Sequence, residues 1–538
     1  MIATIDAREL HAALRDGAEI ALIDVREQGA HSEAHPLLSA CLGLSRLDLQ
    51  AARFLPRRDL RIVVHDGGED DDALARRGVG VLRALGYTDV RLLKGGAAAW
   101  QAAGLELFSG VNVPSKAFGE VIEHRHDTPR VTADELAAMR AGTAPIVILD
   151  SRPMDEYRRI SIPGGIDCPG AELVYRVHEM APDPATTVVV NCAGRTRSII
   201  GAQSLINAGV PNRVVALKDG TMGWQLAGHE PATGRTEHAR APGAEALAVA
   251  RARATAVARR FQIESIDGAG LAAWLADSSR TTIVLDVRTA QEYAAGHWPG
   301  AWHAPGGQLV QATDEYVMVR GARLVLADGP DGVRATMTAH WLRQMGWPQV
   351  RVLTEQAAQP EVGPEPASPW PEGVECIAAT DLLAAVAGED PPTLIDLDSS
   401  RQFARGHLPG AWWSTRARLP QAASELAARG ARLDPVVFVS RDDTLAAWAC
   451  RDWIGAGHGA ARVLTGGAVA WQQAGGGIIS GEADRMLGAA DDVWLKPYER
   501  VGEGHRAMQE YLTWEVGLVA QLEREGTLQF WWPAEDAA

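Results

Sequence analysis

Short runs of apolar residues recur along the chain, and each run ends at an acidic residue. The four runs are ALIDVR, VILDSR, IVLDVR and TLIDLD, whose aspartates are Asp24, Asp150, Asp286 and Asp396. A second apolar run follows each of them, and these second runs are LRIVVHD, TTVVVNC, ARLVLAD and PVVFVS. Continuous apolar runs bounded by turn residues are typical of strands that are buried on both faces of a parallel sheet. The pattern therefore predicts one unit that is repeated four times.

Stretches of helical composition separate the apolar runs, and a short third run such as VRLLKGG follows the last of these stretches. Clusters of Gly and Pro mark the turns. Strands that alternate with helices indicate an α/β fold, in which helices cover both faces of a mostly parallel sheet. The sequence therefore predicts four tandem α/β domains and a helical C-terminal extension.

Changes in composition suggest where these units begin and end. Residues 243–260 contain strong helix formers and predict a linking helix, whereas residues 359–373 are rich in proline and predict an extended linker. In the tail, apolar residues recur every three or four positions, which predicts a helix. The predicted units are residues 1–110, 125–235, 240–360 and 374–480, followed by the extension 481–538.

The composition favours several soluble globular domains. Of 538 residues, 46% are hydrophobic and 22% are charged, which is enough apolar material for buried cores. The net charge of −16 provides no general basic field, so neither nucleic acid nor anionic lipid is an expected partner. The five cysteines form neither a disulfide framework nor a Cys-x-x-Cys pair, which favours a reducing, cytoplasmic setting. No apolar run has the length of a membrane span, and the N-terminal residues do not resemble a secretory signal.

One cysteine stands where a parallel α/β domain binds its ligands. Cys192 follows the second apolar run of the second repeat and opens a loop before an apolar helix. Backbone N–H groups and the helix dipole at such a loop bind anions and lower the pKa of a thiol. Arg195 and Arg197 add positive charge. The segment therefore predicts a nucleophilic thiolate that faces an anionic substrate, with the loop residues Ala193, Gly194, Arg195, Thr196, Arg197 and Ser198 as its binding site.

The other three repeats have no thiol at this position. Alignment of the strand ends places Asp66, Asp328 and Ser440 there. A carboxylate repels anions, and the serine has no obvious base to activate it. We expect these three repeats to be catalytically silent. The acidic residues from Asp66 to Asp72 leave open a site for a cation or a regulatory ligand, although such runs are more often solvated loops.

The chain resembles a tandem array of rhodanese-like, or sulfurtransferase, domains. The resemblance covers about residues 5–480 and rests on LDSR, DEYRRISIPGG, VVVNCAGRTRS and KDGTMGW in the second repeat and on LDVRTAQEYAAGHWPGAWHAP in the third. It implies that Cys192 accepts a sulfane sulfur as a persulfide and passes it to a nucleophile. Related phosphatases separate the cysteine from an arginine by five residues. Here Arg197 comes one position too early, which disfavours a phosphatase.

The resemblance implies a sulfurtransferase that needs no metal or organic cofactor. The two arginines favour thiosulfate as the donor over mercaptopyruvate, because mercaptopyruvate enzymes typically carry small neutral residues in this loop. Cyanide, glutathione, a dithiol and another protein stay open as acceptors, and the oligomeric state cannot be predicted. In an alternative hypothesis, the array is a persulfide carrier or an interaction scaffold for a partner enzyme of sulfur metabolism. The three silent repeats and the tail motivate that alternative.

The second repeat departs from the family pattern in its GHIPGA element. Ile160 and Ser161 replace the usual glycine and histidine, whereas His297 and His407 keep the histidine in repeats that have no cysteine. We therefore expect this histidine to serve the fold and not the reaction.

Two further roles are expected in the second repeat. Asp150, Arg152 and Glu156 are interpreted as a structural ion network. Trp224 in the KDGTMGW segment is expected to form a wall of the pocket beside the loop.

Overall fold

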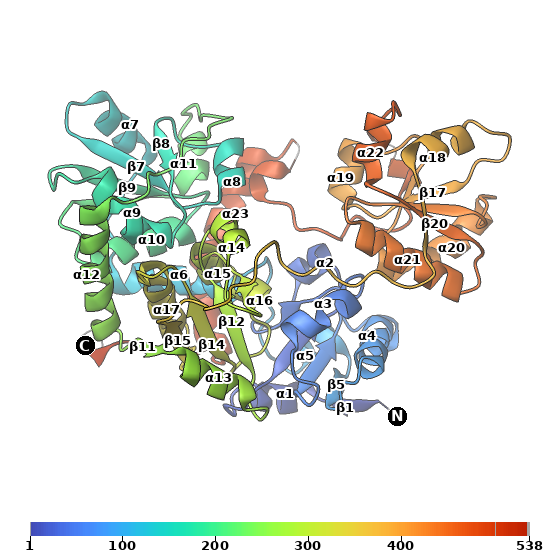
Figure 1. The fold of residues 1–538 in the computed structure, drawn as a ribbon, viewed down its shortest axis with the longest axis horizontal. Coiled ribbons are helices and arrows are strands. Elements are labelled where there is room, and N and C mark those ends of the chain that lie inside the picture. The colour runs from blue at the N-terminus through green and yellow to red at the C-terminus, as the bar shows by residue number, and fades with distance from the viewer. Residues whose placement is uncertain (1, 482, 501, 535–538) are drawn as a thin grey trace.

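Four five-stranded parallel sheets organise the chain, one in each repeat (Figure 1). The computed structural model describes residues 2–481, 483–500 and 502–534. Residues 482, 501 and 535–538 of the predicted extension lie outside the described residues, as does residue 1 of the first predicted domain. The predicted fold class, four α/β domains with a helical C-terminal extension, is confirmed.

All four sheets share one strand order, in which the first strand of a repeat is followed by the fifth, fourth, second and third. The fourth strand therefore lies in the centre of each sheet. In the second repeat this strand is β9 (Thr187–Asn191), and its residues Val188, Val189 and Val190 are fully buried because helices cover both faces. Ligands bind beyond the carboxyl end of such a strand, and Cys192 lies there.

The first two repeats are joined by the helix α6 (Val113–His126). The first repeat contains β1 (Ala3–Ile5), α1 (Ala7–Ala13), β2 (Ala21–Asp24), α2 (Gln28–Glu33), β3 (Ala40–Cys41), α3 (Leu47–Phe54), β4 (Ile62–His65), α4 (Ala73–Ala84), β5 (Val90–Leu93) and α5 (Gly96–Ala102). The second contains β6 (Arg130–Val131), α7 (Ala133–Ala141), β7 (Ile146–Asp150), α8 (Met154–Arg159), β8 (Gly165–Asp167), α9 (Glu172–Met180), β9, α10 (Thr196–Asn207), β10 (Val214–Leu217) and α11 (Gly220–Leu226).

The helix α12 (Ala244–Arg260) covers the stretch where the sequence predicts a linking helix. The third repeat contains β11 (Glu264–Ile266), α13 (Gly268–Ala276), β12 (Thr282–Asp286), α14 (Ala290–Ala295), β13 (Trp302–His303), α15 (Gly306–Gln311), α16 (Thr313–Tyr316), β14 (Arg323–Ala327), α17 (Val333–Gln344) and β15 (Val350–Leu353). The fourth contains β16 (Glu375–Ile377), α18 (Ala379–Val386), β17 (Thr393–Asp396), α19 (Ser400–Arg405), β18 (Trp412–Trp413), α20 (Leu419–Ala428), β19 (Val436–Val439), α21 (Asp443–Gly455), β20 (Ala461–Leu464) and α22 (Gly467–Gln473).

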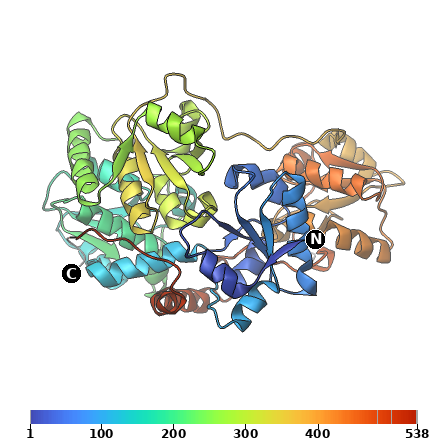
Figure 2. The same ribbon diagram turned by 90° about the horizontal axis from the view of Figure 1, so that it is seen from below.

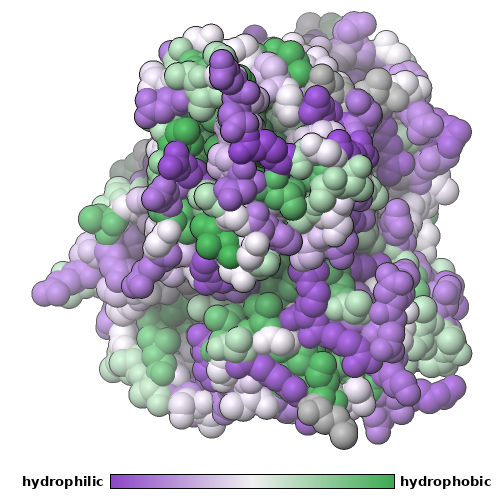
Figure 3. Space-filling view, turned by 90° about the vertical axis from the view of Figure 1, so that its right-hand side faces the viewer, coloured by the Kyte–Doolittle hydropathy of each residue, from purple (hydrophilic) through white to green (hydrophobic). Residues whose placement is uncertain are grey.

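The first three repeats pack together, whereas the fourth stands to one side of them (Figure 1). The Pro-rich segment 359–373 has no helix or strand and runs across the molecule to the fourth repeat. That repeat also contacts the first through Arg416, whose guanidinium pairs with Asp48 at 2.6 Å. Figure 3 views the molecule from this side, where hydrophilic side chains are interspersed with hydrophobic ones. Between residues 2 and 534, none of the described helices is both long and apolar enough to cross a bilayer.

The C-terminal extension returns from the fourth repeat to the second. It contains the long helix α23 (Gly504–Glu525), which lies beside α6 (Figure 2), and continues past this helix to residue 534. Leu518 and Leu522 of α23 pack with Val113 and Ala117 of α6 and with Phe108. Since α6 also packs against α10, the extension is positioned next to the helix that follows the Cys192 loop.

Candidate active site

The loop between β9 and α10 places Cys192 at the bottom of a cavity. The side chain is buried, with 2% of its surface exposed, and its Sγ lies 3.5 Å from the hydroxyl oxygen of Ser198. No described residue accepts a hydrogen bond from the backbone N–H groups of Ala193, Gly194 or Arg195. These donors therefore remain available to an anion bound at the sulfur.

The start of α11 holds the carbonyl side of this loop. Thr221 N–H donates to the Cys192 carbonyl at 2.8 Å, and Met222 N–H donates to the Ala193 carbonyl at 2.9 Å. The approach requires Gly220, which has φ +55°, because a Cβ there would lie 2.4 Å from the Cys192 carbonyl oxygen. The segment KDGTMGW thus holds the backbone of the Cys192 loop in place through these two hydrogen bonds.

The cavity above Cys192 has a volume of about 250 Å³ and is built from several parts of the chain. The second repeat supplies the loop, Glu156 and Met222, and the third repeat adds Gln308 and Gln311. The remaining walls come from the first repeat, the α6 region and the C-terminal extension, with Gln28, Val111, Asn112, Lys116, Trp494, Lys496, Pro497, Tyr498, Tyr511 and Glu515 among their residues. The site is therefore complete only in the assembled chain.

The two loop arginines have different environments. Arg195 donates to both oxygens of Glu120 at 2.7 Å and also pairs with Glu123 and with Asp219, the latter at 3.1 Å. Burial opposes its charge, but these carboxylates outweigh burial and raise the pKa of Arg195. With three carboxylates around it, Arg195 fastens the loop to α6.

Arg197 lines the cavity with fewer carboxylate partners. It donates to the two oxygens of Glu156 at 3.1 and 2.9 Å and to the Gln308 side chain at 3.2 Å. Lys496 of the extension pairs with the same Glu156 at 3.0 Å. Two cations therefore share one carboxylate at the cavity wall, which leaves net positive charge for an anionic ligand.

The predicted lowering of the Cys192 pKa is wrong. Burial raises the pKa of the thiol above its ordinary value, although Arg197 and hydrogen bonding with Ser198 act in the opposite direction. The desolvation of a fully enclosed sulfur is the stronger effect here. Burial therefore favours the neutral thiol over the thiolate at Cys192.

The predicted wall role of Trp224 is also wrong. Trp224 is buried in the core with Leu136 and Val189, and its indole N–H donates to the Glu230 carbonyl at 3.0 Å. The equivalent Trp100 and Trp471 make the same bond to a carbonyl six residues later, in repeats that lack the thiol. The tryptophan therefore closes the end of each such repeat, and Met222 of the same helix lines the cavity instead.

The ion network of the second repeat is partly structural and partly attached to the site. Arg152 is fully buried, pairs with Asp150 at 2.7 Å and donates to the Ile160 carbonyl at 2.6 Å. Arg26 and Arg288 form the same contacts in silent repeats. Glu156, in contrast, contacts Arg197 at the cavity.

The histidine of the GHIPGA element stabilises a turn. His297 stacks on Tyr293 and contacts its carbonyl oxygen at 2.8 Å, and His407 does the same with Phe403 at 2.7 Å. Both histidines are buried in their own repeats. These contacts agree with the expectation that the residue serves the fold.

Aspartates close the corresponding loops of two silent repeats. Asp66 accepts hydrogen bonds from the N–H groups of Gly68 and Ala75, both at 2.9 Å. Asp328 accepts from the N–H groups of Gly329 at 2.7 Å and Ala335 at 3.0 Å. In both loops a carboxylate of the chain itself occupies the place that an anion would take.

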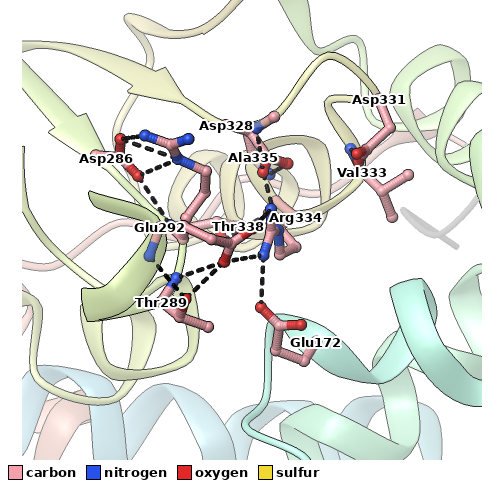
Figure 4. Close-up of polar contacts among 12 residues, drawn as sticks. Glu172, Asp286, Thr289, Glu292, Asp328, Asp331, Val333, Arg334, Ala335 and Thr338 are labelled. Atoms are coloured by element: carbon pink, nitrogen blue, oxygen red, sulfur yellow. Dashed lines mark hydrogen bonds and ion pairs between the residues drawn. The ribbon is translucent and has the colours of Figure 1, made fainter. Parts of the chain in front are cut away.

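In the third repeat Arg334 completes this closure (Figure 4). Its guanidinium donates to Asp328 at 2.9 Å, to both oxygens of Glu292 at 2.8 and 2.9 Å, and to Glu172 of the second repeat at 2.9 Å. Burial raises the pKa of Asp328 to about 6, with Arg334 opposing that shift. The loop is thus filled by internal ion pairs, and it joins the third repeat to the second.

The fourth repeat has no carboxylate at the loop start. Ser440 donates to Asp398 at 3.2 Å and accepts from the Asp442 N–H at 3.0 Å, so its hydroxyl holds the loop.

The described residues between 2 and 534 contain no group of three or more His, Cys, Asp or Glu side chains that could hold a metal ion. The acidic residues near Asp66 therefore form no such group.

The sequence motifs led to the loop but not to the residues that enclose it. Lys116 and Gln308 lie outside the motif of the second repeat, and Tyr511 and Glu515 lie more than 300 residues beyond it. The cluster of Trp494, Tyr498 and Tyr511 in the tail is the one local signal that could have indicated a covering segment.

The chain matches one known domain family and is similar to proteins named as thiosulfate sulfurtransferases. The rhodanese-like domain family matches residues 6–103, 132–227, 271–355 and 378–474. The crystal structure of a thiosulfate sulfurtransferase from Pseudomonas aeruginosa is similar over 98% of this chain and 99% of that one, with a TM-score of 0.91 and 47% sequence identity.

A shorter similarity links the chain to the SseB protein of Mycobacterium tuberculosis, whose name assigns it provisionally to the thiosulfate sulfurtransferases. The two are 31% identical over 149 residues, which is 26% of this chain and 50% of SseB. The chain thus spans about half the length of the curated relatives that it matches.

Proposed function

Because the chain belongs to the family of rhodanese-like domains and is similar to a thiosulfate sulfurtransferase over nearly its whole length, we propose that it is a sulfurtransferase of that type and that Cys192 carries the transferred sulfur as a persulfide. The Cys192 sulfur attacks the outer sulfur of thiosulfate and forms a new S–S bond. The S–S bond of the donor breaks, and sulfite leaves with the thiol proton as bisulfite. A thiophilic acceptor then takes the outer sulfur, and Cys192 returns to its thiol.

The observation that carries this proposal is the enclosed cavity around a single cysteine. The N–H groups of Ala193, Gly194 and Arg195 donate to no described residue, and they belong to the loop that follows Cys192, where a persulfide anion would form. Preorganised donors of this kind are most effective where water is excluded. The Ser198 N–H contributes less, because it donates to the Arg195 carbonyl at 3.1 Å.

Thiosulfate is the proposed donor because Arg197 and Lys496 place two positive charges on one wall of the cavity. Arg197 and Lys496 share the single carboxylate Glu156, and either could take up a sulfonate oxygen. Arg195 has a supporting role in this proposal, since its carboxylate partners already satisfy it. The residues proposed to contact the donor are thus Arg197, Lys496, Thr196 and the N–H groups of Ala193 and Gly194.

A persulfide carrier for a partner enzyme is a weaker proposal. A carrier must expose its sulfur to a second protein, whereas Cys192 lies beneath walls from three repeats and the extension. The enclosure favours small acceptors that enter the cavity.

The experiment that tests the proposal is the intact mass of the protein before and after thiosulfate, and again after cyanide. We expect a gain of one sulfur atom that cyanide removes, absent in Cys192→Ser and retained in Cys450→Ser, a matched change at a buried cysteine far from the cavity. A gain that persists in Cys192→Ser, or no gain with either thiosulfate or mercaptopyruvate, would contradict it. Faster loading from mercaptopyruvate would replace thiosulfate as the donor.

A further inference from the structure

Glu515 is a buried carboxylate that the helix α23 brings into the Cys192 cavity. Its side chain is 2% exposed. The Tyr511 hydroxyl, one helical turn earlier, donates to Glu515 Oε1 at 2.9 Å, and the Thr196 hydroxyl donates to the same oxygen at 3.4 Å. These two bonds hold the carboxylate by one oxygen only.

The second oxygen, Oε2, faces the loop and is without a partner. Although it is buried, none of the described residues donates a hydrogen bond to it. It lies 3.2 Å from the position that a Cβ on Gly194 would occupy, two residues after Cys192. Burying a carboxylate oxygen without a hydrogen bond costs free energy of folding. Because this oxygen lies beside the reactive loop, we infer that it accepts a proton, or a hydrogen bond from a bound ligand.

A caged lysine supplies positive charge near this carboxylate. Lys116 Nζ donates to the Val111 carbonyl at 2.6 Å and lies 4.9 to 5.3 Å from the ring centres of Trp494, Tyr511 and Trp514. Aromatic faces stabilise an ammonium group that has lost its water. The cage fixes Lys116 in the cavity wall, and no described carboxylate forms a salt bridge with it.

Several charged and titratable groups face Glu515. They are Lys116 and Glu120 from α6, Cys192 and Arg195 from the loop, and Tyr511 from α23. The charge of Arg197 acts on the neighbouring Tyr511. Burial raises the pKa of Glu515 to about 7, and the Lys116 charge opposes this shift. Burial likewise lowers the pKa of Lys116 to about 8. Glu515 can therefore gain and lose a proton near neutral pH, whereas burial raises the pKa of Tyr511 well above its usual value and keeps it a donor.

We propose that Glu515 transfers the proton in the second half of the reaction, from an incoming small thiol to Cys192. The inference rests on the persulfide step proposed above. The S–H bond of the acceptor breaks and an O–H bond forms at Oε2, while the acceptor sulfur forms an S–S bond with the outer sulfur of the persulfide. The bond from this outer sulfur to Cys192 Sγ breaks, its electron pair stays on Sγ, and Sγ then takes the proton from Glu515.

This scheme names the acceptor class and returns the enzyme to its starting state. The product leaves as a persulfide anion, and no outside oxidant or reductant takes part. A protonated small thiol needs a base within the cavity, whereas sulfite has no S–H bond to break. The dependence on Glu515 should therefore differ between these two acceptors.

Single-turnover discharge of the loaded persulfide tests the inference. With 2-mercaptoethanol at pH 7, we expect Glu515→Gln to be about a hundredfold slower than the wild type, the lower range for general-base catalysis. With sulfite the two should agree within about twofold. The deficit should also vanish with 2,2,2-trifluoroethanethiol at alkaline pH, because that thiol is already ionised. Glu510→Gln is the matched control, since Glu510 is exposed on the same helix.

The possible outcomes separate this inference from the proposed function. Equal losses with both acceptors, or no loss with either, would overturn the role of Glu515 alone. A wild-type chain that takes up no sulfur would overturn the persulfide step and this inference with it. If Glu515→Gln does not fold, Tyr511→Phe decides the question. That variant keeps the carboxylate and should slow only the thiol reaction, and an unselective effect would count against the inference.

Discussion

At the scale of single residues, the four repeats differ in the partner of the aspartate that ends their first apolar run. Asp24, Asp150 and Asp286 end the first apolar run of their repeats, and each pairs with an arginine two residues later. In the fourth repeat, Asp398 stands where that arginine would be. Asp396 is buried and forms no salt bridge with any described residue. Burial, with Asp398 adding to it and the Arg441 charge opposing it, raises the pKa of Asp396 to about 7.

This difference predicts opposite changes in stability at pH 8 for two matched variants. The Asp396 carboxyl ionises near pH 3.8 in the unfolded chain and near 7 in the folded one, so the wild type loses stability as the pH rises between these values, by roughly 4 kcal/mol when the loss is complete. Asp396→Asn should thus become more stable than the wild type as the pH rises from 4 to 8. Thermal unfolding followed across that range measures the effect.

Asp286→Asn is the control for this prediction. In the wild type, Arg288 Nη2 lies 2.5 Å from Asp286 Oδ2. The substitution removes this carboxylate and leaves the mostly buried Arg288 guanidinium without a counter-charge. The variant should lose about 3 kcal/mol at pH 8. If both variants shift the melting temperature in the same direction at pH 8, the explanation by the missing arginine fails.

At the scale of elements, α23 is the covering segment of the active site. Leu518 is fully buried against α6, so Leu518→Ala should cost about 2 to 5 kcal/mol and loosen the docking of α23. We expect faster alkylation of Cys192 by iodoacetamide, measured by peptide mass on a Cys376→Ser background because Cys376 is exposed.

Val516→Ala provides the comparison for that variant. Val516 lies on the same helix with 47% of its surface exposed, so its truncation removes little packing. Its alkylation rate should match that of the parent. An unchanged rate in Leu518→Ala would mean that the extension does not control access to the thiol.

The elements also show how far the sequence could lead. Buried strands impose continuous apolar runs, and the motif around Cys192 is contiguous, so both the four sheets and the reactive loop could be predicted from local patterns. The contact between Thr196 and Glu515 joins residues 319 positions apart, and no local pattern encodes such a contact. Trp224 was misplaced for a related reason, because its indole bond is a feature of the repeat and not of the site.

At the scale of the whole molecule, the assembly of repeats limits the size of the acceptor. The cavity of about 250 Å³ has walls from the first three repeats and the extension, and Cys192 is 2% exposed within it. We expect dithiothreitol to discharge the persulfide much faster than reduced thioredoxin, a folded protein with a dithiol of similar chemistry. Timed discharge followed by intact mass measures both rates. Comparable rates would indicate that the walls open widely and would favour a carrier role.

The aspartates that fill the loops of the first and third repeats determine how many anionic ligands one chain binds. Asp66 and Asp328 occupy the backbone donors of their own loops, and Ser440 offers no thiol. A chain with four copies of one fold should therefore behave as monovalent. At the loop that follows the fourth strand of each repeat, oxyanion inhibitors, electrophiles and sulfur donors would each bind or react once per chain. Plots of occupancy against concentration would show no cooperativity between the four copies.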